Sequence, residues 1–128
     1  NRLPSLNTGG NVGAAAWVFA SATLKLPTVG LVGMDLGYYP ETPYKLTQTY
    51  YELAVHAGGE EGMERYFQDF TFPLTGERYY TDPTYFWYRK NLLQLVSQAA
   101  TRTCNCTEGG TLFGPHISCI SLDEFLKH

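Results

Sequence analysis

Two short segments that read as strands, each followed by a polar, glycine-rich turn, constrain what this chain can fold into more than any other feature. Residues 28–32 read Thr-Val-Gly-Leu-Val, and a Gly-Met-Asp turn at residues 33–35 follows them. Residues 102–106 form a second such segment, before the turn at residues 107–111. An apolar run without alternation is typical of a strand covered on both faces, as in a parallel sheet. We therefore expect an α/β protein with a partial parallel sheet.

Helical patterns flank the first of these segments. A polar turn at residues 7–11 runs into an apolar stretch that predicts a helix at about residues 12–24. Because that helix is apolar on all sides, we expect it to be buried. Thr42 and Pro43 are a favourable N-cap and first helical residue, and the apolar spacing behind them predicts a helix up to Ala57.

The pattern of apolar residues is weak at residues 60–81 and strong again from Asp82 onward. A short helix near residues 60–70 and a loop at residues 73–81 are the expectations there. Asp82 and Pro83 then repeat the sequence of a cap and a proline, and predict a long helix to about Ala100.

The last helix has a complete start signal. Ser121 and Glu124 form a capping box, and Ile120 and Phe125 stand where a hydrophobic staple requires apolar residues.

Length and composition favour one packed domain. The chain has 128 residues, of which 44% are hydrophobic and 16% charged. No internal repeat or linker is visible, so residues 1–128 are interpreted as a single Rossmann-like domain or its carboxy-terminal part. Two strands alone are marginal. We therefore expect further strands upstream or a second copy of the chain, and favour a fragment that associates into a homo-oligomer.

Charge and cysteine content exclude several classes of function. The net charge is -3 and the basic residues are scattered, which argues against nucleic-acid binding. The longest apolar stretch, at residues 14–20, is too short to cross a membrane, and no signal peptide is visible. Cys104, Cys106 and Cys119 are a sparse, odd set that does not suggest a disulfide framework. A soluble, cytoplasmic protein is the expectation.

Polar, glycine-rich loops are the candidate ligand-binding residues. In an open parallel sheet, ligands lie beyond the carboxyl ends of the strands, and glycine lets a phosphate approach the backbone. The expected nucleotide-binding residues are Gly9, Gly10, Asn11, Gly33, Asn105, Thr107, Gly109 and Gly110. Each also has a purely structural interpretation as a turn or cap residue, and the first set lacks the Gly-Lys-Ser/Thr ending of a Walker loop.

Three further residues are candidates for acid–base or metal chemistry. Asp35 follows the first strand and is both a catalytic candidate and the one expected metal ligand. Glu108 stands beside two glycines, and His116 follows a Gly-Pro turn near the second loop. Each could equally be a turn or surface residue. The 10 tyrosines are a further theme, because phenol groups can stack on a base or donate to phosphate oxygens, although most are expected to be packing residues.

With these residues in view, the chain resembles a known family. The segments at residues 8–13 (TGGNVG), 31–37 (LVGMDLG), 105–110 (NCTEGG) and 121–126 (SLDEFL) are similar, in order and spacing, to the family of bacterial motility accessory factor glycosyltransferases and archaeal 6-hydroxymethylpterin pyrophosphokinases. The likeness covers most of the chain from Thr8 onward. It implies a Rossmann-like fold of the sialyltransferase type, with a nucleotide or nucleotide-sugar site at these loops.

The resemblance leaves three functions open. A glycosyltransferase would pass a cytidine-activated nonulosonic acid to a hydroxyl without a metal. A pyrophosphokinase would move pyrophosphate from ATP, with Asp35 holding magnesium against the phosphates. A non-catalytic fragment or scaffold module would bind no nucleotide. The upstream half of the usual domain is missing from this sequence.

Overall fold

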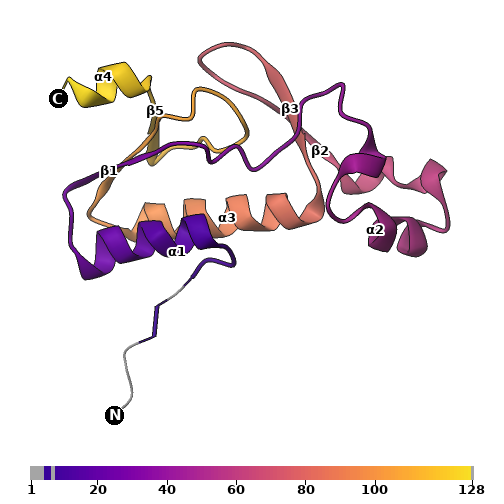
Figure 1. Ribbon diagram of the computed structural model, residues 1–128, viewed down its shortest axis with the longest axis horizontal. Coiled ribbons are helices and arrows are strands. Elements are labelled where there is room, and N and C mark those ends of the chain that lie inside the picture. Colours follow the sequence, from indigo (N-terminus) through magenta and orange to yellow (C-terminus); the bar gives the residue numbers. More distant parts are fainter. Residues whose placement is uncertain (1–4, 7, 128) are drawn as a thin grey trace.

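The computed structural model describes residues 5–6 and 8–127 (Figure 1). The helices are α1 (Val12–Val18), α2 (Tyr50–Ala57), α3 (Pro83–Gln98) and α4 (Leu122–Leu126), and α1 continues as a π-helical turn (Phe19–Thr23). The strands are β1 (Thr28–Leu31), β2 (Gln68–Thr71), β3 (Arg78–Thr81), β4 (Arg102–Asn105) and β5 (Ile117–Cys119). Short 3-10 turns lie at Tyr44–Leu46, Glu60–Gly62 and Glu64–Tyr66. Asn7, in the predicted first turn, lies outside the described residues.

The larger sheet is parallel and has the order β1-β4-β5. Leu31 of β1 pairs with Asn105 of β4, and Thr103 of β4 pairs with Ile117 of β5. The two predicted strands are thus parallel neighbours, as expected. β5 was not predicted, because a strand of three residues carries almost no sequence pattern. The chain is a mixed α/β protein with a three-stranded parallel sheet flanked by helices, which is compatible with part of a Rossmann-like fold.

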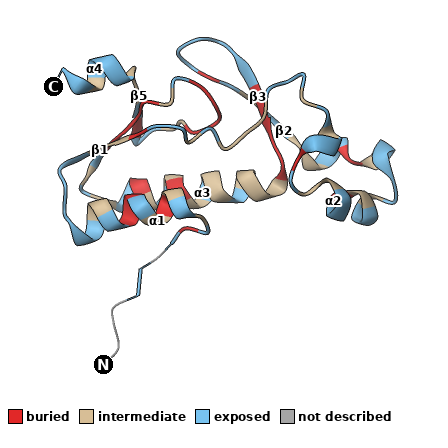
Figure 2. Cartoon of the chain, viewed as in Figure 1, coloured by how far each residue is buried: buried red, intermediate tan, exposed pale blue. Residues whose placement is uncertain are grey.

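One face of this sheet is covered by α1 and α3, and the hydrophobic core lies between them (Figures 1 and 2). Its buried members are Ala14, Trp17, Val18, Leu31, Leu92, Val96, Leu112 and Ile117. Trp17 Nε1 also donates a hydrogen bond to Thr103 Oγ1 at 2.9 Å, which ties α1 to β4. On the opposite face α4 contacts the sheet, where a Cβ at Gly30 would lie 3.0 Å from the ring of Phe125.

α1 and β1 are less buried than their apolar sequences predict. Val12 is 87% exposed and Phe19 45%, so the helix is buried along one side only. Its alanines permit close packing on the core side without requiring cover on the other. Thr28 is exposed and Val32 is 61% exposed just after β1. The expectation of a strand covered on both faces holds only in part, because Leu31 is buried and Phe125 lies against Gly30, whereas Thr28 is exposed.

The segment at residues 60–81 differs most from expectation. Two 3-10 turns and β2 replace the predicted helix at residues 60–70, and β3 occupies part of the predicted loop at residues 73–81. β2 and β3 form an antiparallel hairpin. Gly76, with φ of 73°, supplies the left-handed conformation in its turn. Both strands are four residues long, and neither alternates between buried and exposed residues. The sequence therefore lacks the alternation of apolar and polar residues that would have predicted them.

α2 begins at Tyr50 rather than at Pro43. Pro43 is extended, with ψ of 143°, and only a 3-10 turn follows it. The chain leaves the helical conformation at Thr47, which has ψ of 153° and whose Oγ1 donates to the carbonyl of Tyr44 at 2.6 Å. A local side-chain bond of this kind competes with helix continuation.

The starts of α3 and α4 are as predicted. The Asp82 carboxylate accepts a hydrogen bond from Tyr85 N at 2.8 Å, and Pro83 is the first helical residue. Ser121 Oγ accepts from Glu124 N at 3.0 Å. Within residues 5–6 and 8–127, none of the helices has both the length and the apolar character that crossing a bilayer requires.

Candidate functional site

The carboxyl ends of β1 and β4 lie side by side, as predicted. Cys106 N donates to the carbonyl of Leu31 at 2.7 Å, and Met34 N donates to Thr107 Oγ1 at 3.1 Å. Beyond them, Thr111 N donates to the carbonyl of Asp35 at 2.8 Å. The two predicted ligand-binding loops are therefore in direct contact.

That contact fills the space in which a ligand was expected. Gly109 and Gly110 are buried, and a Cβ at Gly110 would lie 2.5 Å from the carbonyl oxygen of Asp35. Asn105 is fully buried, with Nδ2 donating to the carbonyl of Leu112 at 2.7 Å and Oδ1 accepting from Thr107 N at 3.0 Å. These residues close the loop on itself and hold it against the exit of β1.

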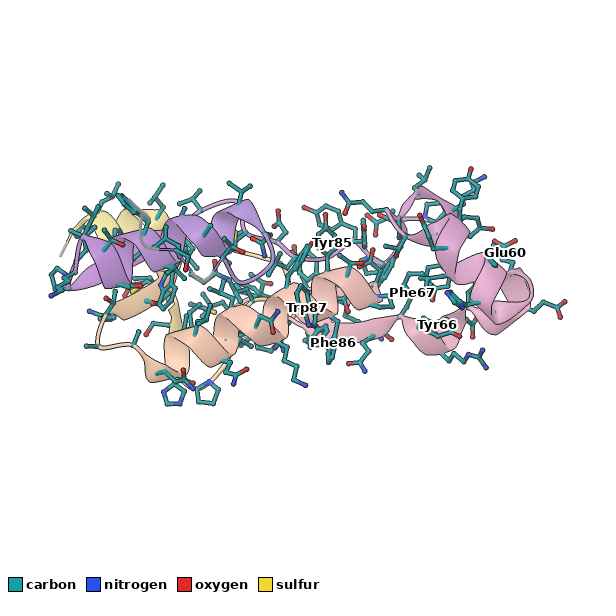
Figure 3. The ribbon with its side chains drawn as sticks, turned by 90° about the horizontal axis from the view of Figure 1, so that it is seen from below. Glu60, Tyr66, Phe67, Tyr85, Phe86 and Trp87 are labelled. Carbon is teal, nitrogen blue, oxygen red and sulfur yellow. The ribbon has the colours of Figure 1, made fainter. Side chains whose placement is uncertain are left out.

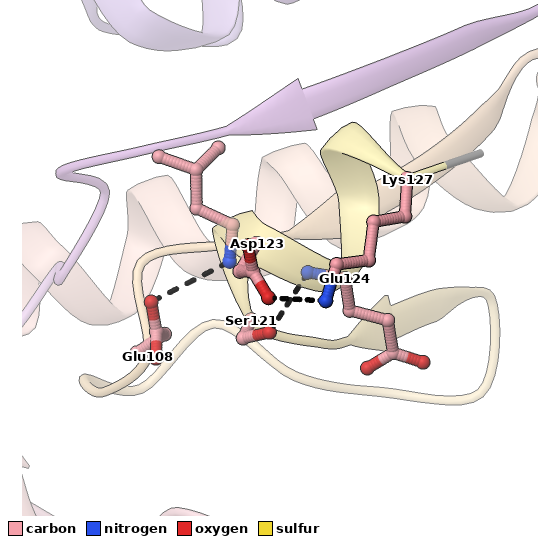
Figure 4. A network of polar contacts seen from close by, with 6 residues as sticks. Glu108, Ser121, Asp123, Glu124 and Lys127 are labelled. Atoms are coloured by element: carbon pink, nitrogen blue, oxygen red, sulfur yellow. Dashed lines mark hydrogen bonds and ion pairs between the residues drawn. The ribbon is translucent and has the colours of Figure 1, made fainter.

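The acid–base candidates lie on separate segments. Gly33 and Asp35 are exposed after β1, and His116 is exposed in the turn before β5. Glu108, with φ of 65°, accepts a long hydrogen bond of 3.4 Å from Leu122 N at the start of α4 (Figure 4). Its position beside the capping bond of Ser121 gives it a structural contact with that helix.

Asp35, the predicted magnesium ligand, belongs to no cluster of three or more candidate metal ligands among the described residues. In the part of the chain that the structure describes, no three His, Cys, Asp or Glu side chains gather where they could hold a metal ion. A hard cation takes several oxygen ligands. One exposed carboxylate does not build a metal site by itself, but magnesium bound with a nucleotide takes most of its ligands from phosphate and water, so Asp35 as a magnesium ligand stays a prediction.

The glycine turn is the predicted site segment that borders a pocket. Gly9 and Gly10 have φ of 63° and 96°, and a Cβ at Gly10 would lie 2.4 Å from the indole of Trp87. Asn11 Oδ1 caps α1 by accepting from Ala14 N at 2.9 Å. Only glycine allows the turn to approach the face of α3 this closely.

Between this turn and α3 lies a cavity of about 450 Å³, here called the glycine-turn pocket. Residues 8–10 line one side, and Trp87, Asn91, Gln94 and Gln98 line the other. Carboxamides both donate and accept hydrogen bonds, and none of the lining residues is charged. The pocket therefore offers donors and acceptors for the hydroxyl groups of a sugar or ribose ring.

A second cavity of about 350 Å³ lies on the other side of Trp87 and is here called the cation–aromatic pocket. Arg65 and Lys90 are its basic residues, and the aromatic ones are Tyr66, Phe86 and Trp87. Figure 3 shows Phe86 and Trp87 on α3 with Tyr66 on the neighbouring 3-10 segment. Trp87 lines both cavities, so the two adjoin along α3.

Tyr44, Tyr79 and Tyr80 gather elsewhere, and the hydroxyls of Tyr79 and Tyr80 donate hydrogen bonds. They line a third cavity of about 400 Å³, bounded by residues 40–44 and by the β2–β3 hairpin. Tyr79 OH donates to Glu77 Oε2 at 2.6 Å, and Tyr80 OH to the carbonyl of Thr42 at 2.6 Å. Burial raises the pKa of both Tyr79 and Tyr80 to about 12. These phenols hold the hairpin in place and do not supply free donors for a phosphate.

The α3 residues were not among the predicted site residues, because the sequence pattern there was interpreted only as that of a long helix. Trp87, Lys90, Asn91, Gln94 and Gln98 follow one another at intervals of three or four, or sit next to each other, and so share one face. A large indole in the middle of a polar face was the available signal. Of the segments that complete the pockets, residues 8–10 include the predicted Gly9 and Gly10, whereas residues 65–68 contain no predicted site residue.

Comparisons with protein-family models, curated proteins and solved structures each found no match for the chain. The resemblance drawn from the sequence motifs therefore stays a prediction, and the pockets on α3 carry the functional argument.

Proposed function

We propose that this chain is a nucleotide-dependent transferase of the glycosyltransferase type, related to the sialyltransferase fold, and that it binds a nucleotide-activated sugar along α3. The observation that carries the proposal is the glycine-turn pocket, because it joins a predicted ligand-binding turn to an indole and three carboxamides. A concave site with a few convergent polar groups is the usual form of a small-molecule site.

The chemistry of the pocket favours a sugar ring. Asn91, Gln94 and Gln98 offer both donors and acceptors, which is what vicinal hydroxyl groups require. Trp87 is 53% exposed and offers an apolar face for the C–H surface of the ring. In the transfer, the acceptor hydroxyl forms a bond to the anomeric carbon while the bond from that carbon to the phosphate oxygen breaks. The phosphate keeps the electron pair, and the hydroxyl proton goes to solvent.

Glycosyl transfer is favoured over pyrophosphoryl transfer by the ligands available to a cation. A pyrophosphokinase needs magnesium between the phosphates of ATP. Asp35 stands apart from the pockets on α3, and no group of acidic side chains completes a cation site in the described part of the chain. The proposed ligand is thus bound by neutral and basic side chains, without a metal.

A thermal-shift panel of CMP and ATP, each with and without magnesium, tests the proposal. CMP at 100 times its Kd is expected to stabilise the fold by about 2.7 kcal/mol, and without magnesium. Trp87→Ala is expected to abolish this shift, because it removes the shared wall of both pockets. Tyr51→Ala, at a residue that is 77% exposed on α2, is the matched control and should keep it.

The other two functions have distinct outcomes in the same panel. Stabilisation by ATP only in the presence of magnesium would replace the proposal with pyrophosphoryl transfer. No effect of either nucleotide on melting would leave a non-catalytic module.

A further inference from the structure

We infer that the nucleotide monophosphate part of the ligand lies in the cation–aromatic pocket, while the sugar lies in the glycine-turn pocket and Trp87 separates the two. This inference deepens the proposed function and rests on it. A second site is needed for the phosphate, since the glycine-turn pocket has no charged lining residue to balance it.

The two basic residues of the cation–aromatic pocket are free of acidic partners. The ion pairs among the described residues are Arg78 with Asp69 and Lys127 with Asp123, and neither includes Arg65 or Lys90. The lining residues include no carboxylate. In a chain with a net charge of -3, two cations without an acidic partner at one cavity make a local attraction for an anion.

Arg65 contacts Tyr66, which also lines the cation–aromatic pocket. Its Nη2 donates to Tyr66 OH at 2.9 Å, and its guanidinium lies 4.9 Å from the centre of the Tyr66 ring. A guanidinium has five N–H donors, so others are left for phosphate oxygens. The Tyr66 hydroxyl remains able to donate its own proton to the same anion.

The aromatic residues give the pocket a place for a base. Phe86 and Trp87 are neighbours on α3, and Tyr66 lines the same cavity from the 3-10 turn at Glu64–Tyr66. Stacking of a base on aromatic side chains is worth about 1–3 kcal/mol per base. Cations beside stacking surfaces match a ligand that is both anionic and aromatic, which a nucleoside monophosphate is and a free sugar is not.

The two pockets have the spacing that a joined ligand needs. Lys90 and Gln94 are one turn apart on α3, so their Cα atoms are separated by roughly 6 Å along the helix axis. A phosphate near Lys90 and a sugar near Gln94 are thus adjacent, as they are when joined by a single phosphoester bond.

The test compares affinities for CMP, cytidine and CMP-N-acetylneuraminic acid, measured by titration calorimetry on the whole chain. In the double variant Arg65→Gln/Lys90→Gln, the Kd of CMP is expected to rise at least about 10-fold, because two charge-assisted contacts are lost. Cytidine, which has no phosphate, should bind the double variant and the wild type equally. Gln94→Ala should weaken the sugar conjugate more than it weakens CMP.

Arg78→Gln/Lys45→Gln removes two exposed cations elsewhere and is the matched control, which should bind CMP like the wild type. All four substituted cations are exposed, so the fold should survive, and melting curves verify this. Equal binding of CMP by the wild type and by the Arg65/Lys90 variant would overturn the inference and leave the proposed function standing. Absence of binding by the wild type would overturn the proposed function itself.

Discussion

Gly110→Ala is expected to lower the free energy of unfolding by about 3 kcal/mol or more, through steric overpacking and a strained backbone. Gly110 has φ of 84°, and a Cβ there would lie 2.5 Å from the carbonyl oxygen and 2.7 Å from the Cα of Asp35. Backbone atoms cannot move aside as a flexible side chain can. The contact between the loops after β1 and β4 would have to separate, which chemical denaturation monitored by circular dichroism would detect.

Gly33→Ala is the matched control for this substitution. Gly33 lies in the first of the two loops and has φ of 76°, but nothing lies within 4 Å of a Cβ built there. It should cost only the strain of a left-handed alanine, about 1 kcal/mol. Equal destabilisation by the two substitutions would contradict the close packing of the loops.

Asp82→Ala is expected to lower the free energy of unfolding by about 3 kcal/mol, because one buried carboxylate serves three donors. Asp82 is fully buried and accepts from Tyr85 N at 2.8 Å, from Tyr38 OH at 3.2 Å and from Thr49 Oγ1 at 3.2 Å. The carboxylate therefore caps α3 and also ties it to the segments before and after the 3-10 turn at Tyr44–Leu46. Burial raises the pKa of Tyr38 well above its usual value, so this donor keeps its proton at any ordinary pH.

Two further substitutions define the role of Asp82: one tests its helix-capping bond to Tyr85, and the other is an exposed carboxylate for comparison. Asp82→Asn keeps an acceptor for Tyr85 N and should cost less than alanine. Asp123→Ala, at an exposed carboxylate paired with Lys127, should cost less than about 1 kcal/mol. Thermal unfolding would measure all three, and a loss at Asp123 as large as that at Asp82 would refute the assigned role of the buried carboxylate.

The elements that the sequence predicted correctly are those specified by local chemistry. Asp82 followed by Pro83, and Ser121 followed by Glu124, identify helix starts through bonds made within one turn, so no distant residue is needed. The exits of β1 and β4 were recognised for a similar reason, because each strand is followed directly by a polar turn that contains glycine.

The elements that were missed depend on distant partners. Tyr44 stacks on Phe67 with ring centroids 4.0 Å apart, and this contact accompanies a turn where local pattern favoured the start of a helix. Residues 79–81 of β3 are all buried, and β3 pairs with β2 along one edge and with Tyr38 through an isolated bridge at Tyr80. Phe70-Thr71-Phe72 and residues 78–81, around a turn that contains Gly76, were the available signal for the hairpin.

Only part of the candidate site could be predicted, because the rest depends on contacts between residues that are distant in sequence. Gly9 and Gly10 were identified because a glycine-rich turn at the start of a helix lets a partner, expected to be a phosphate, approach the backbone. That the partner is Trp87 could not be predicted, since it comes from the packing of α1 beside α3. Asn105 was equally conspicuous in the sequence, yet its polar atoms bind the backbone of its own loop.

The indole N–H signals in a ¹H–¹⁵N NMR spectrum test the central claim, binding along α3, most directly. The chain has two tryptophans, and Trp17 is 3% exposed with its Nε1 bonded to Thr103, whereas Trp87 is 53% exposed between the two pockets. Addition of CMP-N-acetylneuraminic acid without magnesium is predicted to shift the Trp87 signal and leave the Trp17 signal in place, with Trp87→Phe providing the assignment. A Trp87 signal that does not move at saturating ligand would contradict the account.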